Sequence, residues 1–454
     1  GNKESPWYVV AFGMVGASLS GITFISVPGD VGSISLTYFQ VVIGYLFGYF
    51  IVAFVLLPVY YKQNLTSIYQ YLGDRFGRNS HMTGAFFFFV SRVLGAAFRL
   101  FLVAIVLQKF VFDSWGIPFE FTVTISILLI WIYTFRGGIK TVVWTDTLQT
   151  FLMILSVFLS IYFITTSLDT GFVDFLYSED FKTKSDIFIT DSILEKNHFI
   201  KSFLGGVFIT ICMTGLDQDM MQKNLTCRTL YDAQKNMIVF SLILVVVTFI
   251  FLILGTLLFT YAEKNDILIP MLNDRESTDL LFPQIALNSG LNLTLSITFL
   301  LGLIAAAYSS ADSALTSLTT SFCIDFLDIE KKDAKIQKKL RFYVHILMSI
   351  FLIIVILIYE NYLSTSVIDS LLIIAGFTYG PLLGLFAFGI FTDYKINDQL
   401  SIFVCIISVV IITIIFYLPE TFLGGYKIGY ELLPINGLIT FFGLYLIRKR
   451  SPLN

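Results

Sequence analysis

The chain has 454 residues, of which 56% are hydrophobic and only 13% are charged, and its mean hydropathy is +0.82. Soluble domains carry about 25% charged residues, so the composition excludes a soluble globular protein. The net charge of -3 offers no basic surface for nucleic acid, and the four cysteines lie too far apart in sequence for a CxxC metal or redox pair. We therefore interpret residues 1–454 as a single transmembrane domain that contacts the lipid bilayer and has no nucleic-acid partner.

Apolar segments of membrane-spanning length follow one another along the chain. Twelve can be drawn, at roughly 7–28, 36–60, 82–112, 119–135, 139–168, 199–222, 234–262, 292–326, 340–360, 364–392, 398–418 and 432–447. They predict an all-α polytopic membrane protein with twelve spans.

Lys and Arg concentrate on alternate sides of these segments. If the N-terminus is cytoplasmic, the inner segments hold more than twice as many basic residues as the outer loops, with the largest group at 331–341. Basic residues near helix ends are retained on the cytoplasmic side, so we expect both termini in the cytoplasm and a multi-pass protein in the plasma (inner) membrane. The two long outer loops, about 169–198 and 263–290, are predicted to be external gates or lids; the alternative is solvated linkers.

The first apolar segment is poor material for an unbroken helix. Between Gly13 and Gly29 it is rich in glycine, serine and threonine, and Pro28 lies near its end. Carbonyls freed by a helix break are tolerated at membrane depth only where protein or an aqueous cavity receives them, and secondary transporters hold ions and substrate at such breaks. The alternative, a close helix contact through small residues, leaves Pro28 and the hydroxyl groups unexplained.

Charged residues also lie inside the third and fifth segments. Arg92 and Arg99 are seven residues apart and share one face of the third segment, so a bound anion or a carboxylate partner must balance them. Asp146 lies roughly two turns inside the fifth segment. A salt-bridge role and a functional role are both open for this carboxylate.

The eighth segment combines a stripe of hydroxyl groups with a carboxylate. Ser309, Ser313, Thr316 and Thr320 recur at intervals of three and four residues and so share a helix face, and Asp312 lies among them. Polar side chains at this depth indicate an ion or substrate path. Hydroxyl groups can instead bond to the preceding turn of their own helix, an explanation that does not extend to Asp312.

Three motifs give the chain a resemblance to the sodium/solute symporter family over essentially its whole length. Gly137-Gly138, followed by Val143-Trp144-Thr145-Asp146 and Gln149, is similar to the signature of the family's fifth core helix. Ser309-Ser310 after Ala306, with Asp325 closing the helix, is similar to the family's sodium helix, and Gly380-Pro381-Leu-Leu-Gly384-Leu-Phe386 is similar to its tenth helix.

The resemblance implies a LeuT-type fold built from two inverted five-helix repeats. Repeat one would span about 7–168 and repeat two about 199–392, with additional C-terminal helices at about 398–447. Members of the family usually have one more helix before the first core span, so we expect sequence to be missing ahead of Gly1.

The resemblance also implies Na+ as the bound ion. The positions that match the family's sodium ligands are Gly16, Leu19, Ala306, Ser309 and Ser310. Five oxygens without a carboxylate suit a monovalent cation, because calcium usually takes about six to eight oxygens. The positions that match a further sodium site of some members are Asp146, Asp312 and Ser313. Relatives usually have a small or hydroxylic residue in place of Asp312, so its partner is left open between a cation, a proton and an arginine of the third segment.

Residues 20–28 are similar to the sialic-acid-transporting members of the family. The resemblance implies substrate contacts from Ser18, Ser20, Thr23 and Tyr38. Those members bind the substrate carboxylate with an arginine whose ungapped equivalent here is Gly95, one turn from both Arg92 and Arg99, and their pocket glutamine falls on Val42. The residues that bind galactose in sugar-transporting members are not matched, which disfavours a hexose and favours a carboxylated solute.

The sequence therefore predicts a sodium-coupled secondary active symporter that imports a small organic solute, sialic acid or another monocarboxylate, by alternating access. A transporter-like membrane sensor is the alternative from another class, although only four residues follow Arg450. A symporter for a neutral sugar, polyol or amino acid is also left open. No HExxH, GxSxG or GxGD sequence occurs, so we expect no enzyme, and no obligate protein partner is evident.

Overall fold

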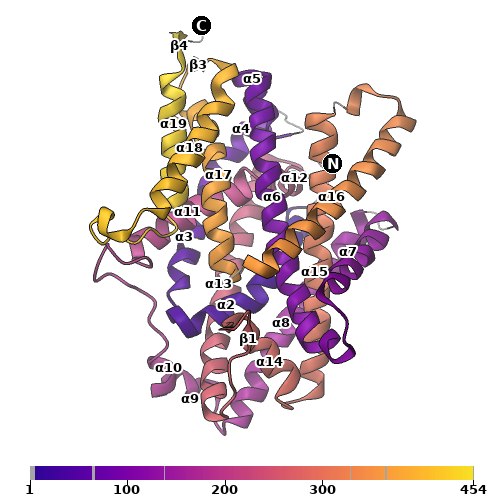
Figure 1. Cartoon of the computed structure of the whole chain (residues 1–454), viewed down its shortest axis with the longest axis vertical. Coiled ribbons are helices and arrows are strands. Elements are labelled where there is room, and N and C mark those ends of the chain that lie inside the picture. Colours follow the sequence, from indigo (N-terminus) through magenta and orange to yellow (C-terminus); the bar gives the residue numbers. More distant parts are fainter. Residues whose placement is uncertain (1–5, 64–66, 137–138, 328, 363–365, 453–454) are drawn as a thin grey trace.

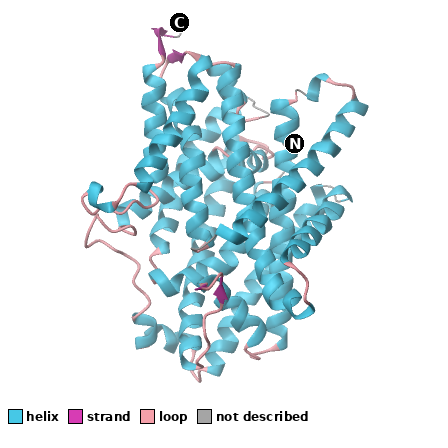
Figure 2. Ribbon diagram, in the orientation of Figure 1, coloured by secondary structure: helices cyan, strands magenta, loops and turns pink. Residues whose placement is uncertain are grey.

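The computed structural model describes residues 6–452 apart from 64–66, 137–138, 328 and 363–365, and apart from the side chains of 133–147, 330, 361–362 and 450–452. In this part of the chain the structure is a bundle of α-helices, and the few strands form two small sheets (Figures 1 and 2).

The helices of the first half are α1 (Trp7–Ser18), α2 (Gly21–Ile34), α3 (Tyr38–Ile51), α4 (Leu57–Gln63), α5 (Gln70–Arg75), α6 (Arg78–Leu107), α7 (Phe119–Arg136), α8 (Ile139–Ser167), α9 (Phe172–Tyr177) and α10 (Glu179–Lys182). Those of the second half are α11 (Phe199–Thr210), α12 (Gln218–Asn224), α13 (Leu230–Lys264), α14 (Leu281–Asn288), α15 (Leu293–Ser321), α16 (Ala334–Tyr362), α17 (Val367–Phe391), α18 (Ser401–Tyr417) and α19 (Leu432–Leu446).

The strands pair at opposite ends of the bundle (Figure 1). β1 (Met271–Leu272) pairs antiparallel with β2 (Arg275–Glu276) near α14, and β3 (Tyr394–Ile396) pairs antiparallel with β4 (Arg448–Pro452) near the C-terminus. The loop that was expected to be a gate or lid, 263–290, thus contains β1, β2, the single turn η5 (Thr278–Leu280) and α14.

Eight helices of the described chain are long and apolar enough to cross a membrane, and the number rises to ten if each of two bent helix pairs counts as one span. The first pair, α1 and α2, is bent by 57°. The second runs from Phe199 to Asn224 and is bent by 71°. The break in the first pair agrees with the sequence prediction, whereas the break in the second was not predicted.

The spans differ in how much of their surface is buried. In the most apolar stretch of each span, the buried share is 72% for Arg78–Trp115, which contains α6, and also 72% for α17. It is only 22% for Asp398–Tyr417, which contains α18. α18 exposes Phe403, Ile407, Val410 and Ile414 at helical spacing, and an apolar stripe is stable there because lipid surrounds it. α6 and α17 therefore lie in the centre of the bundle and α18 at its edge.

Close helix contacts depend on glycine where two backbones nearly touch. α3 packs on α11, and a Cβ atom added to Gly206 of α11 would overlap the carbonyl oxygen of Val41, on α3. Small residues permit this approach, which is the usual basis of helix packing inside membranes. The contact fixes α11, and with it the second break, against the first half of the chain.

Candidate functional site

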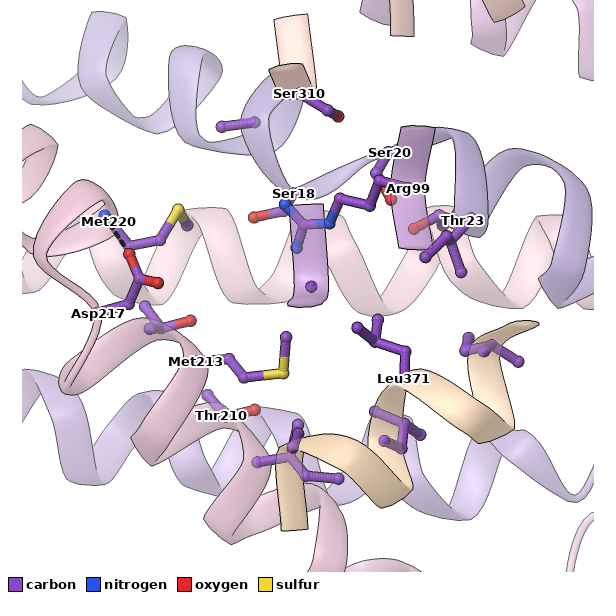
Figure 3. A pocket seen from close by; sticks show the side chains of 18 of the residues that line it. Ser18, Ser20, Thr23, Arg99, Thr210, Met213, Asp217, Met220, Ser310 and Leu371 are labelled. Atoms are coloured by element: carbon purple, nitrogen blue, oxygen red, sulfur yellow. Dashed lines mark hydrogen bonds between the residues drawn. The ribbon is translucent and has the colours of Figure 1, made fainter. Parts of the chain in front are cut away.

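A cavity of about 150 Å³ lies between the two bent helix pairs, α6, α15 and α17. The substrate contacts expected from the sequence all line it, namely Ser18, Ser20, Thr23, Tyr38, Arg92 and Arg99. Ser309, Ser310 and Ser313 of α15 line it as well. Figure 3 shows these elements around the cavity, with Met213 and Leu371 supplying apolar walls. The fold thus gathers residues that are distant in the sequence into one cavity.

The first break lies at Leu19 and Ser20. Leu19 has ψ near 90° and Ser20 has an extended backbone, so neither continues the helix. Pro28 lies inside α2, beyond the break. The interruption therefore follows the serine-rich stretch of the segment, and Pro28 does not cause it.

Two carbonyl oxygens at this break converge on the side chain of Gln149. The Gln149 amide nitrogen Nε2 donates to the carbonyl oxygen of Leu19 at 2.9 Å and to that of Gly16 at 3.4 Å. Gln149 is fully buried, and its oxygen Oε1 has no hydrogen-bond partner. The carbonyls of Gly16 and Leu19 thus point at one position, which is the geometry that a sodium ion requires of main-chain ligands.

The remaining residues of the expected sodium set come from α15. Ala306 is fully buried, and Ser309 and Ser310 are buried with their side chains at the cavity. These neutral oxygens fit a monovalent cation that loses its water on entering a buried site. The residues present therefore fit sodium, although the two carbonyls already accept hydrogen bonds from an amide.

The second break lies at Leu216 and Asp217 and is built differently. Asp217 caps α12 by accepting from the backbone N–H groups of Asp219 at 2.9 Å and Met220 at 3.2 Å. The carbonyl oxygens freed at Gly215 and Leu216 accept from the hydroxyl groups of two buried tyrosines, Tyr60 and Tyr69, each at 2.9 Å. The unwound turn is therefore satisfied by a carboxylate and by two phenols from the first half of the chain.

Arg92 is neutralised by the carboxylates of the second break. Its guanidinium lies 2.9 Å from Asp219 Oδ2 and 3.5 Å from Asp217 Oδ2. Lys223 adds a further charge 3.5 Å from Asp219. Of the two roles open for Arg92, the structure shows the one with a carboxylate partner.

Arg99 is placed differently on the same helix. Its side chain points into the cavity (Figure 3), its Nε has no hydrogen-bond partner, and among the described residues no carboxylate lies within ion-pair distance of it. Gly95, the ungapped match to the family's arginine, lines the cavity one turn away. Among the described residues, Arg99 is therefore a cavity arginine whose charge has no carboxylate partner, in contrast to Arg92.

Two of the three positions of the expected second sodium site, Asp312 and Ser313, lie within the described residues. Asp312 is buried and accepts a hydrogen bond from Thr316 Oγ1 at 3.2 Å. Ser313 donates to Asp219 and lies 3.4 Å from the Arg92 guanidinium, so it belongs to the network around the second break. The side chain of Asp146 lies outside the described residues.

The functional residues that the sequence analysis missed are Asp217, Asp219 and the amide of Gln149. A signal for the first two was present, because two carboxylates inside an apolar segment are unusual and indicate a functional site. Gln149 was identified only as part of a motif, and its contact with α1 depends on the packing of two helices. Val42, where the family's pocket glutamine falls, is buried and is not among the cavity residues.

Comparison with known proteins gives consistent matches. The family described as "Sodium:solute symporter family" matches residues 1–417. The sodium/sialic acid symporter NanT of Aliivibrio fischeri is 27% identical over 403 residues, covering 85% of this chain and 75% of that protein. The sodium/sialic acid symporter SiaT of Proteus mirabilis is 26% identical over 430 residues, covering 90% and 82%. The sodium-coupled monocarboxylate transporter 2 of Danio rerio is 25% identical over 412 residues, covering 87% of this chain and 63% of that protein.

Solved structures share the fold. A Na+-coupled sialic acid symporter in a substrate-bound, outward-open state superposes with a TM-score of 0.81 at 22% identity, covering 99% of this chain and 92% of that chain. Mhp1, a transporter of the nucleobase-cation-symport-1 family in a closed conformation, gives a TM-score of 0.56 at 12% identity, covering 98% and 92%. The helical, LeuT-type character of the expected fold is thereby confirmed.

Proposed function

The chain belongs to the sodium:solute symporter family and is a sodium-coupled membrane transporter, not an enzyme; from this premise we propose that its solute is a small carboxylated molecule, sialic acid or another monocarboxylate. The observation that carries the proposal is Arg99, a guanidinium that points into the cavity without a carboxylate partner among the described residues. Arginine offers a planar fork that matches a carboxylate and keeps its charge when buried.

The surroundings of Arg99 suit an organic acid with hydroxyl groups. Ser18, Ser20 and Thr23 line the cavity beside it and supply neutral donors and acceptors. The relatives named sialic acid symporters and monocarboxylate transporters carry acidic solutes, which supports the same class here. We assign Arg92 a structural role, because its charge is already balanced by Asp217 and Asp219.

We further propose that sodium binds at Gly16, Leu19, Ala306, Ser309 and Ser310. Support comes from the convergence of the Gly16 and Leu19 carbonyls on one point and from the serine pair at the same cavity. A second cation at Asp146, Asp312 and Ser313 remains part of the proposal, with the carboxylate of Asp312 buried as a cation ligand would be.

The architecture we propose has twelve spans and two inverted five-helix repeats, about 7–168 and 199–392, followed by extra helices at about 398–447 in the same single domain, with both termini cytoplasmic. The presence of two bent helix pairs, α1–α2 and α11–α12, supports this proposal, because each pair would be the first span of its repeat. Two shorter apolar helices, Phe119–Ile132 and Leu432–Leu446, would supply the remaining spans.

The test is sodium-dependent binding and uptake by the purified protein. In sodium but not in potassium, sialic acid or a small monocarboxylate should raise the thermal stability, and neutral sugars should not. Arg99→Gln should weaken the affinity for the acid by about 10- to 100-fold, since a hydrogen bond to a charged group contributes about 1.5–3 kcal/mol. Arg228→Gln, an exposed arginine outside the cavity, serves as the control. Full uptake by Arg99→Gln, or an uncharged solute, would contradict the proposal.

A further inference from the structure

A second group of buried oxygens lies outside the cavity, at the end of the bundle that carries β1, β2 and α14 (Figure 1). Asp30 on α2 and Asp279 in the turn η5 are each only 3% exposed. Neither belongs to the cavity or to the sodium positions proposed above. Two carboxylates buried this deeply require a partner, because an isolated buried charge is costly.

The two carboxylates belong to segments that touch. Ser26, Gly29 and Asp30 lie on one face of α2, since they are three and four residues apart. A Cβ atom added to Gly29 would lie 2.8 Å from the carbonyl oxygen of Thr278 and 3.1 Å from the Cα of Asp279. The backbone of η5 therefore rests on this face, which brings Asp279 next to the turn of α2 that carries Asp30.

Four oxygen-bearing side chains, those of Asp30, Asp279, Ser26 and Ser366, lie near one another here, and three of their oxygens lack a hydrogen-bond partner. Asp279 Oδ2 accepts from the backbone N–H of Val367 at 3.0 Å, but Asp279 Oδ1 is buried without a partner. The hydroxyl oxygens of Ser26 and Ser366 also lack hydrogen-bond partners. Ser26 lies beside Asp279, and Ser366 lies beside Asp30.

Lys196, a basic side chain on the same side of the bundle, is already engaged by another carboxylate. Lys196 lies 2.9 Å and 3.0 Å from the two carboxylate oxygens of Asp369, which also accepts from the Tyr430 hydroxyl at 3.0 Å. Asp30 and Asp279 make no ion pair within the described residues. A cavity of about 70 Å³ borders two members of this group, Asp279 and Ser366, and is lined by Arg275 and Glu276 as well.

We propose that Asp30, Asp279, Ser26 and Ser366 bind a sodium ion. A cation between the four side chains would take as ligands the three oxygens without a hydrogen-bond partner, which are Asp279 Oδ1 and the hydroxyl oxygens of Ser26 and Ser366, and its charge would offset part of that of the two carboxylates. Calcium usually takes about six to eight oxygens, more than this group supplies. The ion would join α2 to η5 and to the start of α17, and so fasten the 263–290 loop to the first broken helix.

Equilibrium binding of radioactive sodium to the full chain in lipid nanodiscs tests the proposal. Asp279→Asn and Asp30→Asn should each bind one sodium fewer per protein than the wild type. Ser26→Ala should keep the count at saturation and weaken the affinity of this one site several-fold, which makes the test independent of any folding defect in the aspartate variants. Asp369→Asn is the matched control, a neighbouring carboxylate with its own lysine, and should leave the count unchanged.

The same loss of one ion should appear in a background carrying Ser309→Ala with Ser310→Ala, so the result does not depend on the sodium site of the proposed function. An Asp279→Asn count equal to that of Asp369→Asn would overturn the proposal. A count unchanged in every variant, combined with an altered proton uptake in Asp279→Asn, would overturn it in favour of a carboxyl pair that shares a proton.

Discussion

The backbone groups that are freed at the two helix breaks of this protein are satisfied by different kinds of side chain. At the first break, the carbonyls of Gly16 and Leu19 accept from one neutral amide, that of Gln149. At the second break, Asp217 caps the following helix and joins Asp219 in neutralising Arg92. The first break is therefore held by weak, replaceable contacts and the second by charges that are costly to separate.

This difference assigns the two breaks different roles. A site that must bind and release an ion in every cycle benefits from ligands whose partner can be displaced cheaply, and a neutral hydrogen bond contributes only about 0.5–1.5 kcal/mol. A buried ion pair that loses one partner leaves a charge without compensation. If sodium binds at the first break as proposed, the second break is suited to holding the shape of the cavity while the first exchanges its ion.

The largest effect is expected from removing the charge at the second break. Arg92→Gln should destabilise the protein by about 3–5 kcal/mol, because Asp217 and Asp219 would be left without their buried partner. The measurement is the thermal unfolding of the purified protein in nanodiscs. Lys182→Ala, which breaks an exposed ion pair with Glu179, should change the stability by less than about 1 kcal/mol. Equal unfolding temperatures for Arg92→Gln and Lys182→Ala would show that the second break is not held by its buried charges.

Removing the hydroxyl groups of Ser309 and Ser310 is expected to change the stability less, but to have a large effect on the coupling of transport to sodium. Ser309→Ala with Ser310→Ala should abolish sodium dependence, since each lost partner in a dry site costs about 1–3 kcal/mol. Uptake into proteoliposomes, measured with and without a sodium gradient, provides the readout. The matched control is Ser296→Ala, a serine of the same helix whose hydroxyl bonds to the carbonyl of Ala286. Sodium dependence that survives in the double variant would rule out this site.

The sequence predicted the first break and missed the second for a physical reason. Glycine and serine residues in the first segment weaken the helix locally, so the break could be predicted without any knowledge of its neighbours. The second segment has a single glycine near its break, and the interruption depends on the Asp217 cap and on hydroxyl groups from Tyr60 and Tyr69, which are remote in sequence. Local patterns predict elements and weak points, but they do not show which distant groups stabilise them.

The same limit explains why the sequence did not distinguish the roles of Arg92 and Arg99. Their spacing predicted a shared helix face, and both do line the cavity. Which of them is free to meet an anion depends on Asp217 and Asp219, whose position follows from the bend in the second helix pair. Most of the apolar helices and several of the cavity residues could therefore be predicted from the sequence, while the pairing of charges required the fold.

The smallest effect, and the finest test of the comparison, is expected from Gln149. If the amide competes with sodium for the carbonyls of Gly16 and Leu19, Gln149→Leu should lower the stability of the sodium-free protein and tighten sodium binding several-fold, because the ion no longer has to displace two hydrogen bonds. Thermal unfolding across a sodium titration measures both quantities at once. Gln149→Glu is the companion variant: a carboxylate in the same place accepts where the amide donates, so it should attract the cation and repel the carbonyls. A weaker sodium affinity in Gln149→Leu would show instead that the amide oxygen is itself a sodium ligand. Gln149 would then be as necessary to the first break as Asp217 and Asp219 are to the second, and the contrast between the two breaks would fail.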